Sequence, residues 1–200
     1  PSGCGKSTLL RILAGLLPPT QGTVKITPGK DPSKPLNSVV FQEYAIFPWK
    51  TVLDNVAFGL EMRGFSTSVR YEKAKYWIDA VGLNKFVTYY PHQISGGMKQ
   101  RVSIARALAN DPEVLLMDEP LGALDAQTRN VLQELILQIW ESTKKTVMYI
   151  THSIDEAVLL SDQIVLMTAH PGTKKVVYDV NISRPRGMET TGTPEYAKLS

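Results

Sequence analysis

The sequence has few of the features that are typical of secreted, membrane-spanning or nucleic-acid-binding proteins. Its one cysteine, Cys4, has no disulfide partner within the 200 residues, so we expect a reducing compartment. No run approaches the roughly 18 apolar residues that a membrane span needs, and no signal segment opens the sequence. Lys and Arg exceed Asp and Glu by only 22 to 19, without long runs of one sign, so we expect no nucleic-acid partner.

Hydrophobic residues are plentiful enough for one core. They make up 43% of the chain, which at this length predicts a single domain over residues 1–200. Strand and helix patterns alternate at both ends, and a mostly helical segment occupies residues from about 50 to 110. This order predicts an α/β fold with a mostly parallel central sheet and an inserted helical subdomain.

The expected elements follow from hydrophobic periodicity, caps and breakers. Expected strands occupy residues 23–26, 38–41, 114–117, 146–150, 163–167 and 175–180. Expected helices occupy residues 6–17, 53–63, 68–81, 96–109 and 126 to about 142, with one more after Ser153. The expected signals at helix ends are Pro18-Pro19 for the first helix, Gly64 and Gly82 as C-caps, Asp125 as an N-cap, and a Ser153–Glu156 capping box.

A glycine-rich segment matches the Gly-x-x-x-x-Gly-Lys-Ser/Thr phosphate loop from its second position onward. It reads Pro1-Ser2-Gly3-Cys4-Gly5-Lys6-Ser7-Thr8. The glycines let backbone N–H groups face a polyphosphate, Lys6 adds a cation, the Ser7 hydroxyl can bind Mg²⁺, and the helix adds the positive end of its dipole. The alternative is a glycine-rich helix start that binds nothing. Cys4 is expected to be a small filler rather than a redox group.

The chain opens inside this motif and without a methionine, so we expect it to be a piece of a longer protein. The strand that would lead into the loop is expected among the preceding residues, and so are other strands of the sheet. We therefore expect the 200 residues to fold poorly on their own.

Two carboxylates follow a short apolar run. Residues 114–117 read as a strand buried on both faces, and Asp118 and Glu119 come directly after it. Ligands of parallel sheets bind at the carboxyl ends of the strands. Asp118 is suited to Mg²⁺, directly or through water, and Glu119 to a general base for an attacking water. A capped turn is the alternative reading of this pair.

A second helix start built from small residues occurs at Ser95-Gly96-Gly97. Like the first, it offers free backbone N–H groups to an anion. One nucleotide scarcely needs two such sites. Two copies of the chain placed head to tail, however, could close this segment on the phosphates held by the other copy. An ordinary Ser-Gly helix cap is the alternative.

Together these segments resemble the ABC ATPase family, and the resemblance covers essentially the whole chain. Ile94-Ser95-Gly96-Gly97-Met98 resembles the Leu-Ser-Gly-Gly-Gln signature, and Gln42 falls at the Q-loop glutamine. Leu121-Gly122-Ala123-Leu124-Asp125 resembles the D-loop, and His152 the switch histidine. Met98 and Gly122 depart from the family pattern, which removes an amide and a hydroxyl.

The resemblance implies ATP and Mg²⁺ as ligands. Nucleotide would be held, within one copy or across a dimer, by Ser2, Gly3, Cys4, Gly5, Lys6, Ser7, Thr8, Ser95, Gly96, Gly97 and Asp125. The metal would be held by Ser7, Gln42 and Asp118, and catalysis would involve Glu119, His152 and Gln42. His92 and His170 match no catalytic position and are expected to be structural or exposed. The adenine-stacking residue would precede the chain. Because sheet strands and part of the phosphate loop are expected there too, the 200 residues alone are expected to hydrolyse little ATP.

The resemblance also implies a place in a membrane transporter. The chain would pair with a second ATPase subunit and bind transmembrane permease subunits at the cytoplasmic face of the plasma membrane, serving a solute-binding protein indirectly. Phe47 and Trp49 would meet the permease, unless they belong to the subdomain core. Residues 47–52, 94–101 and 151–157 and the tail at 171–186 resemble bacterial importers for nitrate, sulfonate, taurine or related solutes.

A non-transport ABC ATPase of DNA repair or translation is the alternative. The short separation of Gln42 from Ser95 leaves no room for the long coiled coil of the DNA-repair members. The translation-associated members usually carry two cassettes, whereas this sequence shows one. A P-loop nucleotide kinase would have no use for Ser95-Gly96-Gly97.

Overall fold

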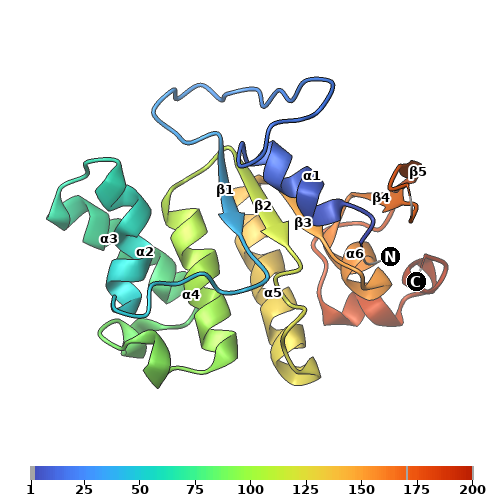
Figure 1. Cartoon of the computed structure of the whole chain (residues 1–200). Coiled ribbons are helices and arrows are strands. Elements are labelled where there is room, and N and C mark those ends of the chain that lie inside the picture. Colours follow the sequence, from blue (N-terminus) through green and yellow to red (C-terminus); the bar gives the residue numbers. More distant parts are fainter. Residues whose placement is uncertain (1–2, 170, 200) are drawn as a thin grey trace.

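The computed structural model of the protein describes residues 3–169 and 171–199. A parallel three-stranded sheet lies at its centre, in the order β1 (Asn37–Val40), β2 (Val114–Asp118) and β3 (Thr146–Ile150) (Figure 1). Asn37 pairs with Val114, and Val114 with Thr146, so the three strands end at the same edge of the sheet. The predicted α/β fold with a mostly parallel central sheet is confirmed.

Different helices cover the two faces of the sheet, because successive strand residues point to opposite faces. Leu116 and Ile150 pack with Leu10 of α1 (Lys6–Leu13). Leu115 and Met117 instead join the large core cluster that also holds residues of α4 (Gly96–Ala109) and α5 (Ala126–Thr143). The sheet is therefore covered on both sides, and α1 begins near the edge where the strands end.

The inserted helical subdomain lies to the left in Figure 1. It contains α2 (Val52–Met62), α3 (Thr67–Ala80) and α4, with two short 3₁₀ turns at Asn84–Phe86 and Pro91–Gln93. Apolar side chains of all three helices belong to the same core cluster as Leu115 of β2. The subdomain is thus continuous with the core of the sheet, and α4 has the predicted bounds.

The C-terminal part, orange and red in Figure 1, consists of short elements. It contains α6 (Ile154–Leu160), the antiparallel strands β4 (Gln163–Met167) and β5 (Lys174–Asp179), a 3₁₀ turn at Met188–Gly192, and α7 (Pro194–Ala197). The buried guanidinium of Arg186 fastens the tail to the end of α6. It donates hydrogen bonds to the carbonyls of Ser161 at 2.6 Å and Ile182 at 2.7 Å.

The first helix is shorter than predicted. α1 ends at Leu13 rather than at residue 17, because Gly15 has a φ of 73°. The N–H groups of Gly15 and Leu16 donate back to the carbonyls of Ile12 and Arg11 at 3.0 and 2.9 Å. These bonds form a Schellman-type cap. The prediction that Pro18-Pro19 ends the helix is therefore wrong.

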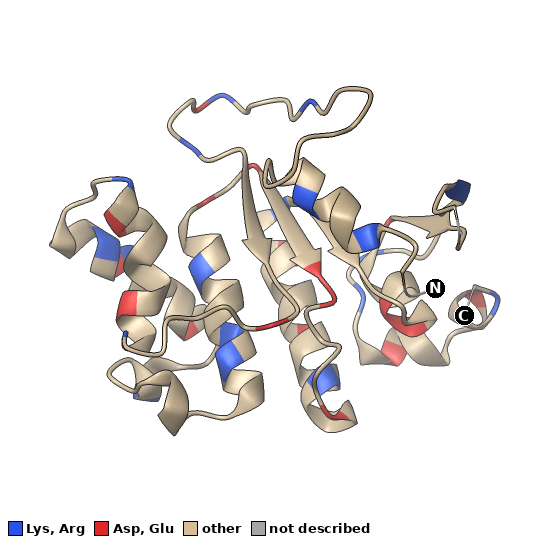
Figure 2. Ribbon diagram, in the orientation of Figure 1, with Lys and Arg blue, Asp and Glu red and all other residues tan. Residues whose placement is uncertain are grey.

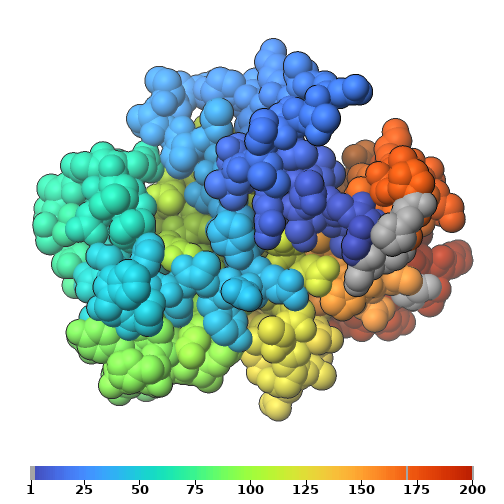
Figure 3. Space-filling model, in the orientation of Figure 1, coloured from blue at the N-terminus to red at the C-terminus, as the bar shows by residue number. Residues whose placement is uncertain are grey.

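The predicted strand at residues 23–26 is also wrong. This segment lies in an exposed loop between α1 and β1, and no strand in the described ranges pairs with it. A strand needs a neighbour to satisfy its backbone N–H and C=O groups. The loop arches away from the sheet at the top of Figure 1 and protrudes at the top of the surface in Figure 3.

The remaining elements begin and end within one or two residues of their predicted bounds. Gly64 and Gly82, with φ of 78° and 71°, follow α2 and α3 as predicted. The capping box is half formed. Ser153 Oγ accepts from the Glu156 N–H at 3.3 Å, but the Glu156 carboxylate turns to other partners.

Two features of the composition can be followed in the structure. Among the described helices, none is long and apolar enough to cross a membrane. Basic and acidic residues are interspersed over the ribbon in Figure 2, and the net charge of the sequence is low.

Candidate nucleotide site

The glycine-rich loop runs directly into the N-terminus of α1. Gly3 and Gly5 have φ of 75° and 92°, a left-handed conformation that glycine adopts without strain. Gly5 is the N-cap of α1. The first N–H groups of a helix have no partner within it and carry the positive end of the helix dipole, which suits an anion. Cys4 is buried, in keeping with a filler, and Lys6 Nζ lies 3.8 Å from its Sγ.

The loop lines a cavity of about 370 Å³ together with residues from two strand ends. Its walls are formed by Gly3, Gly5, Lys6, Ser7, Thr8, Gln42 and Glu119. Gln42 follows β1 and Glu119 follows β2, so three motifs far apart in the sequence meet at one edge of the sheet. The volume lies in the range of small-molecule sites, about 300–1,000 Å³.

Ser7 and Asp118 form a pair of oxygen ligands beside this cavity. Ser7 Oγ donates a hydrogen bond to Asp118 Oδ1 at 3.0 Å, and Asp118 is only 7% exposed at the end of β2. Mg²⁺ is usually held in proteins by one or two carboxylates together with substrate phosphates and water. The described residues contain no group of three or more His, Cys, Asp or Glu that could hold a metal. The donor set therefore fits an ion held mainly by phosphates and water.

Glu119 and His152 form the second pair. Glu119 Oε2 lies 2.9 Å from His152 Nδ1. Glu119 has a φ of 43°, an uncommon conformation for a residue with a side chain, which is often found at functional sites. Its N–H donates to the Ile150 carbonyl at 2.9 Å, and its carbonyl accepts from Gly122 N–H at 3.0 Å. These bonds fix the backbone turn that directs the carboxylate into the cavity.

Gly122, where the family pattern has serine, lies beside the same carboxylate. A Cβ at this position would be 3.6 Å from Glu119 Oε2 and 3.7 Å from Gln42 Nε2, which are ordinary contact distances. A serine side chain here would therefore contact two predicted catalytic side chains, and glycine makes no such contact.

The second helix start stands apart from the cavity. Ser95 caps α4, with its Oγ accepting from Met98 N–H at 3.3 Å, and it is exposed. None of Ser95, Gly96 and Gly97 lines the phosphate cavity. Glycines are needed here for packing as well, because a Cβ at Gly97 would lie 2.5 Å from Thr128 Cγ2. One chain thus carries two separate helix starts suited to anions.

Asp125 lies close to this second helix start. Its Oδ1 accepts from Thr128 N–H at 2.9 Å, so it is the N-cap of α5 as predicted. The hydrogen bonds from the backbone and side chain of Thr128 hold the pKa of the Asp125 carboxyl below its usual value. Because Thr128 also touches Gly97, the two segments predicted to act across a dimer are neighbours on the surface.

Some predicted residues lie elsewhere, and some useful ones were missed. Ser2 and His170 fall outside the described residues. His92 is exposed and stacks on Tyr90, away from the cavity. No local signal in the sequence indicates that Gly172 contacts the phosphate loop. A Cβ at Gly172 would collide with the Cys4 carbonyl, so the turn between β4 and β5 lies against this loop. The sequence predicts Glu156 only as part of a capping box, whereas its carboxylate accepts hydrogen bonds from Tyr149 and Thr151.

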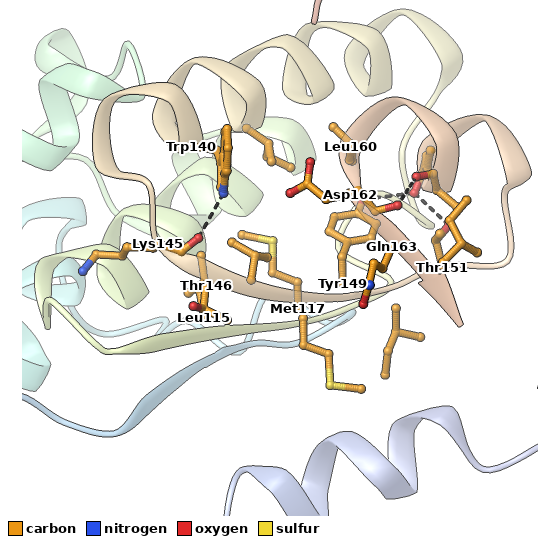
Figure 4. A pocket seen from close by; sticks show the side chains of 18 of the residues that line it. Leu115, Met117, Trp140, Lys145, Thr146, Tyr149, Thr151, Leu160, Asp162 and Gln163 are labelled. Carbon is orange, nitrogen blue, oxygen red and sulfur yellow. Dashed lines mark hydrogen bonds between the residues drawn. The ribbon is translucent and has the colours of Figure 1, made fainter. Parts of the chain in front are cut away.

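A larger cavity of about 980 Å³ lies between β3, α5, α6 and β4 (Figure 4). At one end Trp140 Nε1 donates to the Lys145 carbonyl at 3.0 Å, and Tyr149 and Thr151 lie toward the other. Its walls are mostly apolar, and Lys6 is the predicted site residue among them. Such walls do not suit a polyphosphate, so we assign the nucleotide phosphates to the smaller cavity.

Comparisons with known proteins agree on the kind of protein that this chain resembles. A family model described as ABC transporter matches residues 1–122. An uncharacterized ABC transporter ATP-binding protein of Methanocaldococcus jannaschii is 55% identical over 200 residues, covering 99% of this chain and 74% of the relative.

Two further relatives are named for the solutes that they import. A nitrate import ATP-binding protein of Synechocystis is 45% identical, covering 98% of this chain and 73% of its own. An aliphatic sulfonates import ATP-binding protein of Bacillus thuringiensis is 50% identical over 93% of this chain and 73% of its own.

A solved structure gives the same result for the fold. It is described as the dimeric structure of a bacterial ABC transporter cassette and aligns with a TM-score of 0.76 at 33% identity. The alignment covers 92% of this chain and 84% of that one.

Proposed function

Because the chain belongs to the ABC transporter family, we propose that it hydrolyses ATP in a single ABC ATPase domain and so powers the import of a small solute. One observation carries the chemistry: Lys6, the Ser7–Asp118 pair and the Glu119–His152 pair converge at one cavity. The relatives named for nitrate and sulfonate import support nitrate, sulfonate, taurine or a related compound as cargo. The cargo itself would be selected by other subunits.

The phosphate loop would bind the nucleotide. Backbone N–H groups of residues 3–8 and the Lys6 ammonium would face the phosphates at the positive end of α1. Ser7, Asp118 and Gln42 would hold Mg²⁺, which would neutralise charge on the phosphates when bound. Their oxygen atoms are the ligand type that this ion prefers, and Ser7 and Asp118 are already in contact.

Glu119 would act as the general base. Its carboxylate would take a proton from a water as the water oxygen forms a bond to the γ-phosphorus, while the bond from that phosphorus to the bridging oxygen of ADP breaks. His152 lies 2.9 Å from Glu119, so its ring would orient the carboxylate and contact the γ-phosphate. Gln42, on the cavity wall, would help to place the water.

A second copy of the chain would complete each site. Ser95, Gly96, Gly97 and Asp125 lie outside the cavity but close to one another, which suits segments that act on the nucleotide of a partner. ATP bound between two copies would stabilise the closed dimer by mass action. Opening and closing would then shift the membrane subunit between two states.

An aromatic cluster of Phe47, Trp49 and Phe58, which follows Gln42 in the sequence, would bind the permease. Phe47 packs on Trp49 at 5.6 Å and on Phe58 of α2 at 4.5 Å between ring centroids. Trp49 is 72% exposed, whereas Phe47 is half-buried. We assign Trp49 to the docking surface for a cytoplasmic helix of the permease, and Phe47 to its support. This contact would hold the protein at the cytoplasmic face of the membrane. A solute-binding protein would be linked to it only indirectly, through the permease.

Replacing Trp49 by alanine is expected to weaken assembly with the permease while isolated ATPase activity stays near wild type. The exposed ring makes few internal contacts, so its loss costs the fold little. Co-purification of the full-length protein with its membrane subunit measures assembly. Tyr76→Ala is a matched control, because Tyr76 is 65% exposed in the same subdomain. Intact assembly with lost ATPase activity would contradict the assignment, and absence of any membrane partner would point to a non-transport ABC ATPase.

A further inference from the structure

A buried carboxylate that the proposed chemistry does not use lies behind His152. Glu156, on α6, is 4% exposed. Its Oε2 accepts hydrogen bonds from Thr151 Oγ1 at 2.8 Å and from Tyr149 Oη at 3.0 Å. Figure 4 shows Tyr149 and Thr151 along the end of β3. Glu156 therefore holds the strand end that leads directly into His152.

The backbone on both sides of His152 is fixed to this acid. Thr151 Oγ1 also accepts from Ser153 N–H at 3.0 Å, and Ser153 Oγ accepts from Glu156 N–H at 3.3 Å. Burial, followed by the neighbouring Glu156 carboxylate, raises the pKa of Tyr149 well above its usual value, so its hydroxyl remains a donor at neutral pH. By contrast, the His152 ring is 61% exposed and contacts Glu119. Its position depends on the loop that carries it.

Arg129, on α5, connects the same acid to a second loop. Its Nη2 donates to the Leu124 carbonyl at 3.0 Å. Its Nε lies 3.9 Å from Glu156 Oε1 and is buried without a hydrogen-bond partner in the described ranges. Leu124 precedes Asp125, which the proposed function places toward the second copy. A single arginine thus spans the distance from the dimer-facing loop to the acid behind His152.

We propose that Glu156 is a positioning residue that holds the His152 loop for hydrolysis, and that Arg129 couples this loop to residues 121–125. The inference rests on the proposed function, because it concerns the same site. Through Arg129 and Glu156, a second copy that contacts residues 121–125 would change the position of His152.

An ion pair at the other end of β2 and β3 provides a structural comparison. Lys145 donates to Asp111 Oδ1 at 2.6 Å and to the Pro112 carbonyl at 2.9 Å. It joins the segments that enter β2 and β3, at the opposite ends of the strands that carry Glu119 and His152. Lys145→Gln is therefore a matched control that removes a charge from the same two strands, far from the site.

The experiment uses the full-length protein and the single variants Glu156→Gln, His152→Ala, Thr151→Val and Arg129→Gln, with Lys145→Gln as the control. Glu156→Gln is also combined with His152→Ala and with Arg129→Gln. Glu156→Gln is expected to lower kcat about ten- to hundredfold, since small misplacements of catalytic groups cost that much, while KM for ATP stays near wild type. In the His152→Ala background the same change should have no further effect, because Glu156 acts through His152. Thr151→Val should lower kcat in the same way, and Arg129→Gln should not add to Glu156→Gln.

Hydrogen exchange of the nucleotide-free protein supplies a measurement independent of hydrolysis. Glu156→Gln is expected to speed exchange of the Ser153 amide, whereas Lys145→Gln should not. Unchanged exchange, or kcat losses that multiply in the double mutant with His152→Ala, would overturn the positioning role. A wild-type protein that binds ATP without hydrolysing it would refute the proposed function instead, and the exchange result would still decide whether Glu156 holds the loop.

Discussion

Replacing Glu119 by glutamine is expected to lower ATP turnover by about 10²–10⁴-fold while ATP binding survives. The amide keeps the shape of the carboxylate but cannot accept the proton of the attacking water. Glu119 lines the cavity wall, and its carboxylate lies 2.9 Å from His152. Since Glu119 is outside the phosphate loop, the change should leave that loop intact. Single-turnover hydrolysis and nucleotide binding by the full-length protein measure the two effects separately.

Glu113→Gln is a suitable control for this prediction. Glu113 immediately precedes β2, whereas Glu119 follows it, so the same substitution is made at the opposite end of one strand. Its turnover should match wild type. Wild-type turnover in Glu119→Gln would remove Glu119 from its role, and loss of ATP binding would mean that the residue holds the nucleotide rather than activating water.

Replacing Ser95 by aspartate is expected to abolish ATP-dependent dimerisation and most hydrolysis without preventing ATP binding to the phosphate loop. Aspartate is as good an N-cap as serine, so the bond to the Met98 N–H and the start of α4 should persist. The added carboxylate, however, would face the phosphates of the partner's nucleotide and repel them. Size-exclusion chromatography with ATP, together with nucleotide titration, tests both halves of the expectation.

Ser95→Thr keeps a neutral hydroxyl at the cap and should dimerise and hydrolyse ATP much as wild type does. An ordinary helix cap would tolerate both substitutions, because Ser95 is exposed and its cap bond survives in each. Full activity in Ser95→Asp would therefore favour the helix-cap alternative over a role in the dimer.

The local signals in the sequence predict most of the architecture. Periodicity and caps predict α4 at its observed bounds and Asp125 as the cap of α5. The order of motifs brings Ser7 to Asp118 and Glu119 to His152, since parallel strands present their carboxyl ends at one edge. These features depend on residues near in sequence or on a topology with few alternatives.

What escapes prediction depends on contacts between distant segments. Residues 23–26 have the composition of a strand, but no strand in the described part of the chain pairs with them. Gly15 ends α1 through a backbone cap, and the more obvious prolines that follow play no part. Glu156 has the spacing of a capping box, yet Tyr149 and Thr151 compete for its carboxylate once β3 and α6 pack together. No local pattern reports that competition.

The central claim, that two copies complete each other's site, is tested most directly by mixing two inactive full-length variants. Lys6→Ala disables the phosphate loop and Ser95→Asp the opposing helix start. A mixed dimer would contain two sites. In one of them both Lys6 and Ser95 are intact, and in the other both are replaced. Because neither variant should form ATP-dependent dimers with itself, mixed dimers supply the recovered activity, and we expect it to reach up to about half of the wild-type ATPase rate. If the mixture stays as inactive as the separate variants, both motifs act on the same nucleotide within one chain, and the account of the dimer is wrong.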